Sequence, residues 1–156
     1  MLHVEASTTV RAPKETVSAV YADYRNWPAL FPTISGVRLL GRDGPKLILE
    51  VDHAEGKVRN ELLVRPPDEL HLWEVKRRYD ARFRNRFDAV PGGTRFTVSG
   101  DIRLKGWARL LQPFLGGYVR RQVQRFQLRP VQAEAEARAR HAGGTTGSRG
   151  PDLPHS

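Results

Sequence analysis

The feature that most constrains the fold is a series of strand-like segments in the middle of the chain, joined by turns too short to hold a helix. Apolar and polar residues alternate through segments at about 36–42, 46–53, 57–65, 69–77, 81–89 and 94–104. The joints between them are rich in Gly, Pro and Asp, which are typical turn residues. Joints this short connect antiparallel neighbours, so the series predicts an antiparallel meander.

Such a meander needs a cover, because alternation leaves one of its faces apolar. In one strand Phe83, Asn85 and Phe87 alternate with arginines, which indicates one buried and one solvated face. The expected cover is a long helix beginning near Trp107, whose apolar stripe is backed by arginines and glutamines. This stripe consists of Leu111, Leu115, Val119, Val123 and Phe126. Pro130 is expected to kink or locally break the helix.

The amino-terminal region supplies the remaining elements. Residues 2–10 alternate as a seventh strand, and Pro13 then changes the period and predicts a short helix over about 13–24. A second helical turn is expected from Trp27 to Phe31. The predicted fold class is therefore α+β, a seven-stranded curved antiparallel sheet around a long C-terminal helix, with two short helices after the first strand.

Length and composition favour one domain. The chain has 156 residues, 39% of them hydrophobic, which is enough for a single core. We expect this domain to span 1–140 and the polar segment 141–156 to be a disordered tail, because it has almost nothing to bury. No secretory signal or membrane-spanning run is apparent, so a soluble, cytoplasmic protein is expected.

Several kinds of chemistry find no support in the sequence. The absence of cysteine excludes disulfides, thiolate metal sites and a cysteine nucleophile. The five histidines lack metal-binding spacing, and no phosphate-binding glycine loop or nucleophile elbow is present. We therefore predict no metal and no cofactor, and the sequence offers no positive signal for an enzyme.

The charge of the chain favours anionic partners. A net charge of +9 arises from 26 basic and 17 acidic residues. Because the arginines recur at strand spacing and form no contiguous basic block, a solvated basic surface is one interpretation. Transient contact with an anionic membrane through that surface is another, nucleic-acid binding is not favoured, and the oligomeric state is left undetermined.

Two sequence segments and the terminal helix resemble a known superfamily. The segments are TTVRAPKETVSAVYADYRNWPALFP and VPGGTRFTVSGDIRL, and with the basic amphipathic helix they cover about 1–135. In this order they resemble the SRPBCC (START-like) superfamily, in particular its polyketide cyclase/dehydrase and coenzyme Q-binding members. The resemblance implies a helix-grip (START/Bet v-like) fold with a mostly apolar cavity between sheet and helix.

We expect this cavity to be lined by side chains from the second short helix, from several strands and from the terminal helix. The candidate ligand-binding residues are Trp27, Phe31, Asn60, Trp73, Phe83, Asn85, Phe87, Phe96, Val98, Leu111, Leu115 and Val119. For the apolar ones, a close-packed core is the alternative. Asn60 and Asn85, on faces that look buried, need a partner, which a ligand, a bulge or a buried water would supply. The sequence does not fix which face of 57–65 and 69–77 points inward.

The resemblance also points to one candidate catalytic residue. In the aromatase/cyclases an arginine before a proline-containing turn is implicated in orienting the polyketide, and Arg65 in the segment VRPPD stands at the matching position. The cavity tyrosine of those enzymes falls on Ile34 here, so their proton donor is missing.

Three functions remain open at this point. The leading one is binding, transport or sequestration of a hydrophobic small molecule or lipid. The alternatives are a polyketide cyclase/aromatase-type enzyme and a basic interaction module for an anionic membrane, a nucleic acid or a protein partner. Binding needs only a cavity, whereas cyclisation also needs an oriented acid or base inside it.

Overall fold

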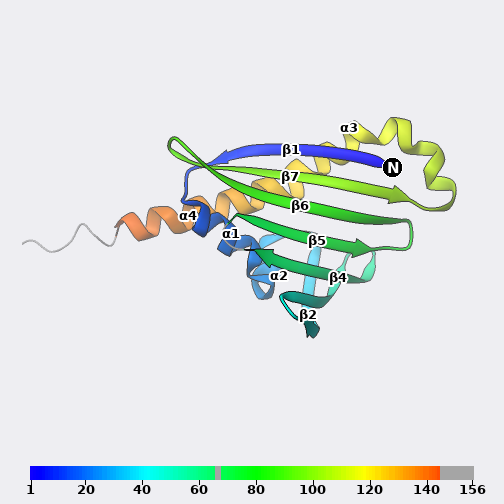
Figure 1. The fold of residues 1–156 in the computed structure, drawn as a ribbon, viewed down its shortest axis with the longest axis horizontal. Helices are drawn as coiled ribbons and strands as arrows, with labels where there is room; N and C mark the ends of the chain where they lie inside the picture. The colour runs from blue at the N-terminus through cyan, green and yellow to red at the C-terminus, as the bar shows by residue number, and fades with distance from the viewer. Residues whose placement is uncertain (66–67, 145–156) are drawn as a thin grey trace, which may run out of the picture.

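The protein, described here by a computed structural model over residues 1–65 and 68–144, is built on one seven-stranded antiparallel sheet (Figure 1). The strands are β1 (Leu2–Val10), β2 (Ile34–Asp43), β3 (Lys46–His53), β4 (Gly56–Arg65), β5 (Glu69–Val75), β6 (Tyr79–Val90) and β7 (Gly93–Leu104). Their order is β1-β7-β6-β5-β4-β3-β2. The predicted meander is therefore confirmed, and the first strand joins it at the free edge of β7.

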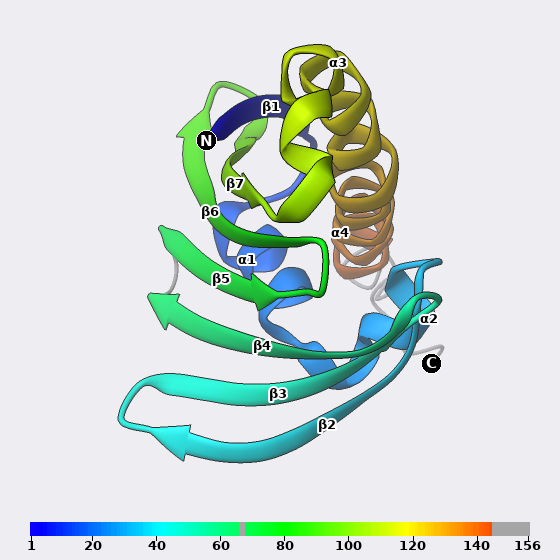
Figure 2. The same ribbon diagram turned by 90° about the vertical axis from the view of Figure 1, so that its right-hand side faces the viewer.

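Helical segments fill the concave side of this sheet. After β1 come α1 (Lys14–Ala22), a 3-10 turn η1 (Tyr24–Asn26) and α2 (Trp27–Leu30). The C-terminal segment comprises a 3-10 helix η2 (Gly106–Leu111), α3 (Gln112–Val123), a π-helical turn η3 (Gln124–Leu128) and α4 (Arg129–Gly144). Figure 2 shows the sheet curling around these helices, which confirms the helix-grip architecture.

The irregularity expected at Pro130 occurs one turn earlier, in η3. A proline ring inside a helix collides with the carbonyl four residues before it, here that of Phe126, and η3 widens the helix at that position. The extra residue shifts the apolar stripe. The predicted stripe continues from Val123 to Phe126, but the residue that is buried next is Leu128. Phe126 is only half-buried.

The register between strands fixes which faces point inward. In β4 the inner face carries Val58, Asn60 and Leu62, because these residues are buried and pair with buried neighbours. In β5 the inner residues are Leu70, Leu72 and Glu74, since Leu72 stands opposite Leu62 and Glu74 opposite Asn60. Trp73 therefore lies on the outer face of the sheet.

One end of the molecule holds an aromatic core, which we call the closed end. Phe87 and Phe96 stack with ring centroids 5.1 Å apart, and Tyr21 meets Phe96 edge-on at 6.1 Å. Trp27 and Phe31 each contact Tyr21 in the same edge-on way, and Trp27 Nε1 donates a hydrogen bond to the Tyr21 carbonyl oxygen at 2.8 Å. These contacts anchor α1 and α2 on the sheet.

The C-terminal helix runs beyond the domain boundary predicted from the sequence. It continues to Gly144, and His141 Nδ1 lies 2.8 Å from the carbonyl oxygen of Ala137, so residues 141–144 are helical and not part of a disordered tail. The remainder of the expected tail, 145–156, lies outside the described residues. Within residues 1–65 and 68–144, no helix is long and apolar enough to span a bilayer.

Candidate functional site

The candidate site lies at the opposite end of the concave face, which we call the open end. There β3, β5 and β7 finish and β1, β4 and β6 begin, so several turns and strand ends meet. Most inward residues of the sheet are apolar. Polar side chains nevertheless enter the inner face from this end, and such groups fix the orientation of a bound molecule in apolar sites.

Asn60 and Glu74 form the innermost polar pair of the open end. They stand opposite each other in β4 and β5, and they are 1% and 8% exposed. The Asn60 Oδ1 atom is buried and has no hydrogen-bond partner among the described residues. A buried amide oxygen without a partner is costly, so this atom is suited to accept a hydrogen bond from a bound group.

Lys76, just after β5, and Tyr79, the first residue of β6, lie beside this pair. Lys76 Nζ donates to the Tyr79 hydroxyl at 2.7 Å and lies 3.7 Å from a Glu74 carboxylate oxygen. Burial by itself lowers the pKa of Lys76, but Glu74 and Tyr79 outweigh it and the net pKa is raised. Burial, followed by Glu74, raises the pKa of Tyr79. Lys76 therefore remains a cation and Tyr79 a neutral hydroxyl at neutral pH.

His53, the last residue of β3, completes the cluster. Burial, with a further contribution from Lys76, lowers its pKa below the usual value. Its Nε2 atom is buried and has no partner among the described residues. The imidazole is therefore neutral at neutral pH and can accept or donate a hydrogen bond, depending on its tautomer.

A further polar group lies deeper, between the open end and the aromatic core. Asn85 is fully buried, and its Nδ2 donates to the carbonyl oxygen of Leu70 at 3.3 Å. That bond fixes the orientation of the amide and leaves Oδ1 without a partner among the described residues. Burial raises the pKa of the neighbouring Tyr21 well above its ordinary value, and a hydrogen bond with Asn85 opposes this effect.

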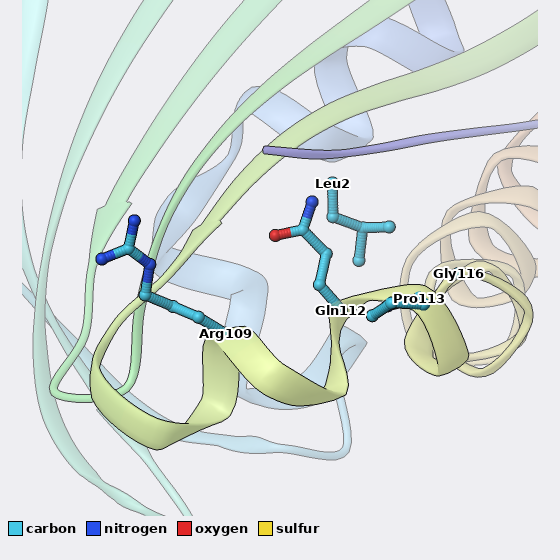
Figure 3. A pocket seen from close by; sticks show the side chains of 5 residues that line it. All are labelled: Leu2, Arg109, Gln112, Pro113 and Gly116. Atoms are coloured by element: carbon cyan, nitrogen blue, oxygen red, sulfur yellow. The ribbon is translucent and has the colours of Figure 1, made fainter.

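Two pockets open at this end, on either side of η2. The larger, about 450 Å³, is lined by Leu2, Arg109, Gln112, Pro113 and Gly116. Figure 3 shows Arg109 and Gln112 extending from the helical segment and Leu2 lying at the start of β1. The smaller, about 330 Å³, is lined by Arg77, Arg78, Lys105, Gly106 and Trp107.

The larger pocket lies beside Pro113 and Gly116 of α3, where the helix itself is regular. Pro113 occupies the first turn of α3, where no backbone N–H is required, and Gly116 and Gly117 are ordinary helical residues. The irregular segment is η2, before the proline. Neither pocket is lined by the predicted walls Phe83, Phe87 and Phe96.

Most of the residues predicted to face the interior do so. Asn60, Phe83, Asn85, Phe87, Phe96 and Val98 are buried on the inner face. Leu115 and Val119 are half-buried and pack against the core from α3, and Trp27 and Phe31 are buried in α2 and at its end. Whether they contact a ligand stays a prediction.

Three predicted site residues point elsewhere. Trp73 stacks on His71 with centroids 5.8 Å apart, and Lys46 Nζ lies 5.3 Å from its ring centre, all on the outer face. Leu111 is 41% exposed, because the 3-10 geometry of η2 turns it away from the sheet. Arg65 is exposed at the outer end of β4, so the interior contains no arginine from this position.

The sequence interpretation missed His53, Glu74, Lys76 and Tyr79. A signal was present: Glu74 shares its strand face with Leu70 and Leu72, and a carboxylate on an apolar face is unusual. The signal was not usable because the inward face of β5 was not known. His53 and Tyr79 stand at strand ends, where alternation carries little information.

Comparisons with known proteins agree with this fold. The Zhui aromatase/cyclase from a Streptomyces species has a TM-score of 0.73 and 19% identity, with coverage of 90% of this chain and 97% of that one. The di-domain aromatase/cyclase StfQ of the steffimycin biosynthetic pathway also reaches 0.73, at 15% identity, and covers 92% of this chain. Only 52% of StfQ is covered, so this chain spans about half its length.

A START superfamily protein from Mycobacterium smegmatis gives a TM-score of 0.61 at 19% identity, with 90% of this chain and 98% of that one covered. A comparison with curated proteins gives no match. The fold and its polar opening thus define a START-like helix-grip protein. The chain belongs to the family described as polyketide cyclase/dehydrase and lipid transport, which matches residues 1–136.

Proposed function

We propose that this protein binds a largely apolar small molecule carrying at least one hydroxyl group, held between the sheet and the C-terminal helix. The observation that carries the proposal is the pair of buried amide oxygens on the inner face, Asn60 Oδ1 and Asn85 Oδ1, which lack partners among the described residues. Each accepts one hydrogen bond at no further desolvation cost to the protein. Apolar neighbours such as Leu62, Leu72 and Phe83 supply the rest of the contact surface.

The open end is the proposed route into the interior. Both pockets lie there, against η2, and the polar cluster of His53, Glu74, Lys76 and Tyr79 stands at the same end. A ligand entering along this route meets hydrogen-bonding groups first and apolar groups further in. Family membership and the START-like fold support this arrangement, since such folds enclose mostly apolar sites.

A matched pair of probes tests the proposal. 2-Naphthol and 2-methylnaphthalene have the same shape, but only the first donates a hydrogen bond. Replacing Asn60 by leucine keeps the volume and removes the acceptor, so we expect Asn60→Leu to weaken 2-naphthol binding about tenfold and to leave 2-methylnaphthalene unaffected. Asn26→Leu, outside the sheet, is the control and leaves both affinities unchanged. Isothermal titration calorimetry measures both probes.

Two outcomes contradict the proposal. If neither probe binds the wild-type protein, the interior is a solid core. If Asn60→Leu weakens both probes equally, the effect is steric and the amide does not act as an acceptor. Native mass spectrometry of the purified protein then shows whether any apolar molecule copurifies.

A second candidate function, proton transfer on a bound polyketide-like substrate, is favoured by one observation. His53 with its lowered pKa, Glu74 and the Tyr79 hydroxyl supply both proton acceptors and a proton donor at one end of the interior. Incubation with a linear poly-β-ketone and chromatography of the aromatic products tests it. Catalysis predicts that His53→Gln and Tyr79→Phe reduce product formation while 2-naphthol binding persists.

A further inference from the structure

An exposed row of large apolar side chains runs along η2 and the first two turns of α3. Three of them are among the most exposed large apolar residues of the described chain: Trp107, Leu110 and Phe114 are 66%, 80% and 82% exposed. The complete row, which we call the apolar ridge, consists of Trp107, Leu110, Leu111, Phe114 and Tyr118. Their spacing of three or four residues places them on one side of the helical segment.

The ridge is not a by-product of an apolar helix. An adjacent side of the same segment already contacts the core through Ala108, Leu115 and Val119, so the helix is held without the ridge residues. No described residue covers the ridge, as its exposure shows. Isolated exposed leucines are common in proteins, but a contiguous apolar surface of this kind usually marks an interaction site.

The segment that carries the ridge is basic, although one of its cations, Lys105, is paired with Asp80 at 2.6 Å. From Ile102 to Ala133 the chain contains seven basic residues and no acidic one. Arg109 lies on η2 and lines the larger pocket, and the exposed Arg120 and Arg121 follow on α3. Arg77 and Arg78 line the small pocket together with Trp107, so the basic surface extends to the β5–β6 connection.

This combination favours one occupant over the others. A second copy of the chain would bring basic surface against basic surface, which is repulsive. A nucleic acid would satisfy the arginines but not the exposed leucines and phenylalanine. An interfacial membrane segment has these features together: Trp, Tyr, Leu and Phe side chains that enter the acyl boundary, and arginines that remain at the headgroups.

We propose that the apolar ridge docks on an anionic lipid bilayer, with Trp107, Leu110 and Phe114 inserted at the interface and Arg109, Arg120 and Arg121 contacting lipid phosphates. Both pockets flank η2, so docking places the open end against the bilayer. An apolar molecule then passes between membrane and protein without crossing water. The docking proposal does not rest on the proposed ligand site and holds even if that site fails its test.

Vesicle flotation with the full chain tests the proposal. We expect binding to vesicles of phosphatidylcholine with 30% phosphatidylglycerol, weaker binding to phosphatidylcholine alone, and loss of binding as salt is raised from 0.1 to 0.5 M. Leu110→Ser with Phe114→Ser removes two inserted side chains and is expected to lower the partition coefficient at least about tenfold. Both residues are exposed, so the fold is retained.

Matched control variants distinguish binding through the ridge from nonspecific binding by exposed apolar residues or by positive charge elsewhere on the surface. Leu40→Ser changes another exposed apolar residue, 49% exposed and on the edge strand β2, and leaves partitioning unchanged. Arg120→Gln with Arg121→Gln weakens binding to anionic vesicles only. Arg82→Gln with Arg95→Gln removes the same charge from the outer sheet face and has a smaller effect.

Tryptophan fluorescence independently measures how deeply the ridge inserts into the bilayer. Trp107 is exposed, whereas Trp27 is buried and Trp73 lies on the outer face of the sheet. Vesicle binding is therefore expected to shift the emission to the blue and to allow quenching by brominated acyl chains, and both effects disappear in Trp107→Phe. Absence of vesicle binding at 0.1 M salt overturns the proposal. So does an equal loss in the Leu40→Ser control, or a dimer in sedimentation that only the ridge variant abolishes.

Discussion

The closed and open ends of the concave face are built from the same seven strands but use them differently. At the closed end, Phe87, Phe96 and Tyr21 are at most 2% exposed and contact one another ring to ring. At the open end, Asn60 and His53 carry buried polar atoms without partners among the described residues, and η2 exposes its largest side chains. The closed end determines the fold, whereas the open end keeps groups available for other molecules.

The glycines of the two ends also differ in the reason for which glycine is required. A Cβ atom on Gly93, at the closed end, would stand 2.0 Å from the carbonyl oxygen of Val10, so β1 and the β6–β7 hairpin approach too closely for any side chain. Gly56 and Gly106, at the open end, have positive φ angles of 120° and 59°, and a Cβ atom there would meet nothing within 4 Å. Close approach requires glycine at one end and turn geometry requires it at the other.

The two ends are expected to respond most differently to the removal of one phenylalanine from each. Phe96→Ala deletes a fully buried ring that contacts Phe87 and Tyr21, and we expect a loss of about 3–5 kcal/mol in the free energy of unfolding. Phe114→Ala removes a ring that is 82% exposed and is expected to change stability by less than about 0.5 kcal/mol. Urea denaturation measures both. Comparable losses of unfolding free energy in the two variants would show that the ridge packs against the core.

The π-helical turn provides a second comparison, between neighbouring residues of one helix. Leu128 is 2% exposed, so Leu128→Ala is expected to cost about 2–5 kcal/mol, whereas the half-buried Phe126→Ala costs less. Without η3 the order reverses, because a regular helix continues the stripe from Val123 to Phe126. Thermal unfolding followed by circular dichroism ranks the stability of the two variants. A larger loss of stability for Phe126→Ala would contradict the observation that Leu128, and not Phe126, faces the core.

The same turn shows how far the sequence specifies the structure. Strand alternation and short turns predict all seven strands and the order of the six in the meander, because both signals are local and recur along the chain, but they do not predict that β1 pairs with β7. Pro130 predicts that the helix is irregular but not where. The position at which the helix widens to accommodate the proline ring depends on how the whole helix packs on the sheet. The predicted place of Phe126 in the buried stripe is wrong for this reason, whereas that of Leu111 is wrong because of the 3-10 geometry of η2.

The candidate site was less accessible to prediction than the fold. Asn60 and Asn85 were found because they share strand faces with apolar residues. Glu74, Lys76 and Tyr79 come together only through the register of β5 with its neighbours, which alternation alone does not fix. A one-residue shift would have placed Trp73 inside and Glu74 outside.

A third substitution tests the region between the two ends. A Cβ atom on Gly100 would lie 2.8 Å from Cε1 of Phe83 and 3.2 Å from Cγ2 of Val4, so Gly100→Ala displaces the ring. We expect a cost of about 1–3 kcal/mol, as for other overpacked cores. Adding Phe83→Leu removes the colliding atoms and recovers part of the loss. Calorimetry of the two variants checks this, and failure of the second substitution to help would assign the strain to the backbone.

The smallest expected effect comes from His53 at the open end. Its pKa is lowered by burial and by Lys76, against the opposing influence of Glu74 and Glu55. The folded protein therefore holds the proton more weakly than the unfolded chain, whose histidines titrate near about pH 6.5. Stability from this group is fully present above that pH and is lost as the pH falls through it towards the lower pKa of the folded state.

His53→Gln keeps a hydrogen-bonding side chain but removes the titration. The difference in unfolding free energy between wild type and His53→Gln is therefore expected to be constant above about pH 7 and to shift in favour of the variant between about pH 6.5 and pH 5. A difference that is flat over the whole range would mean that the imidazole is as well hydrated as in the unfolded chain. The open end would then be wetter than its burial indicates, and His53 would be available to a ligand in its charged form as well.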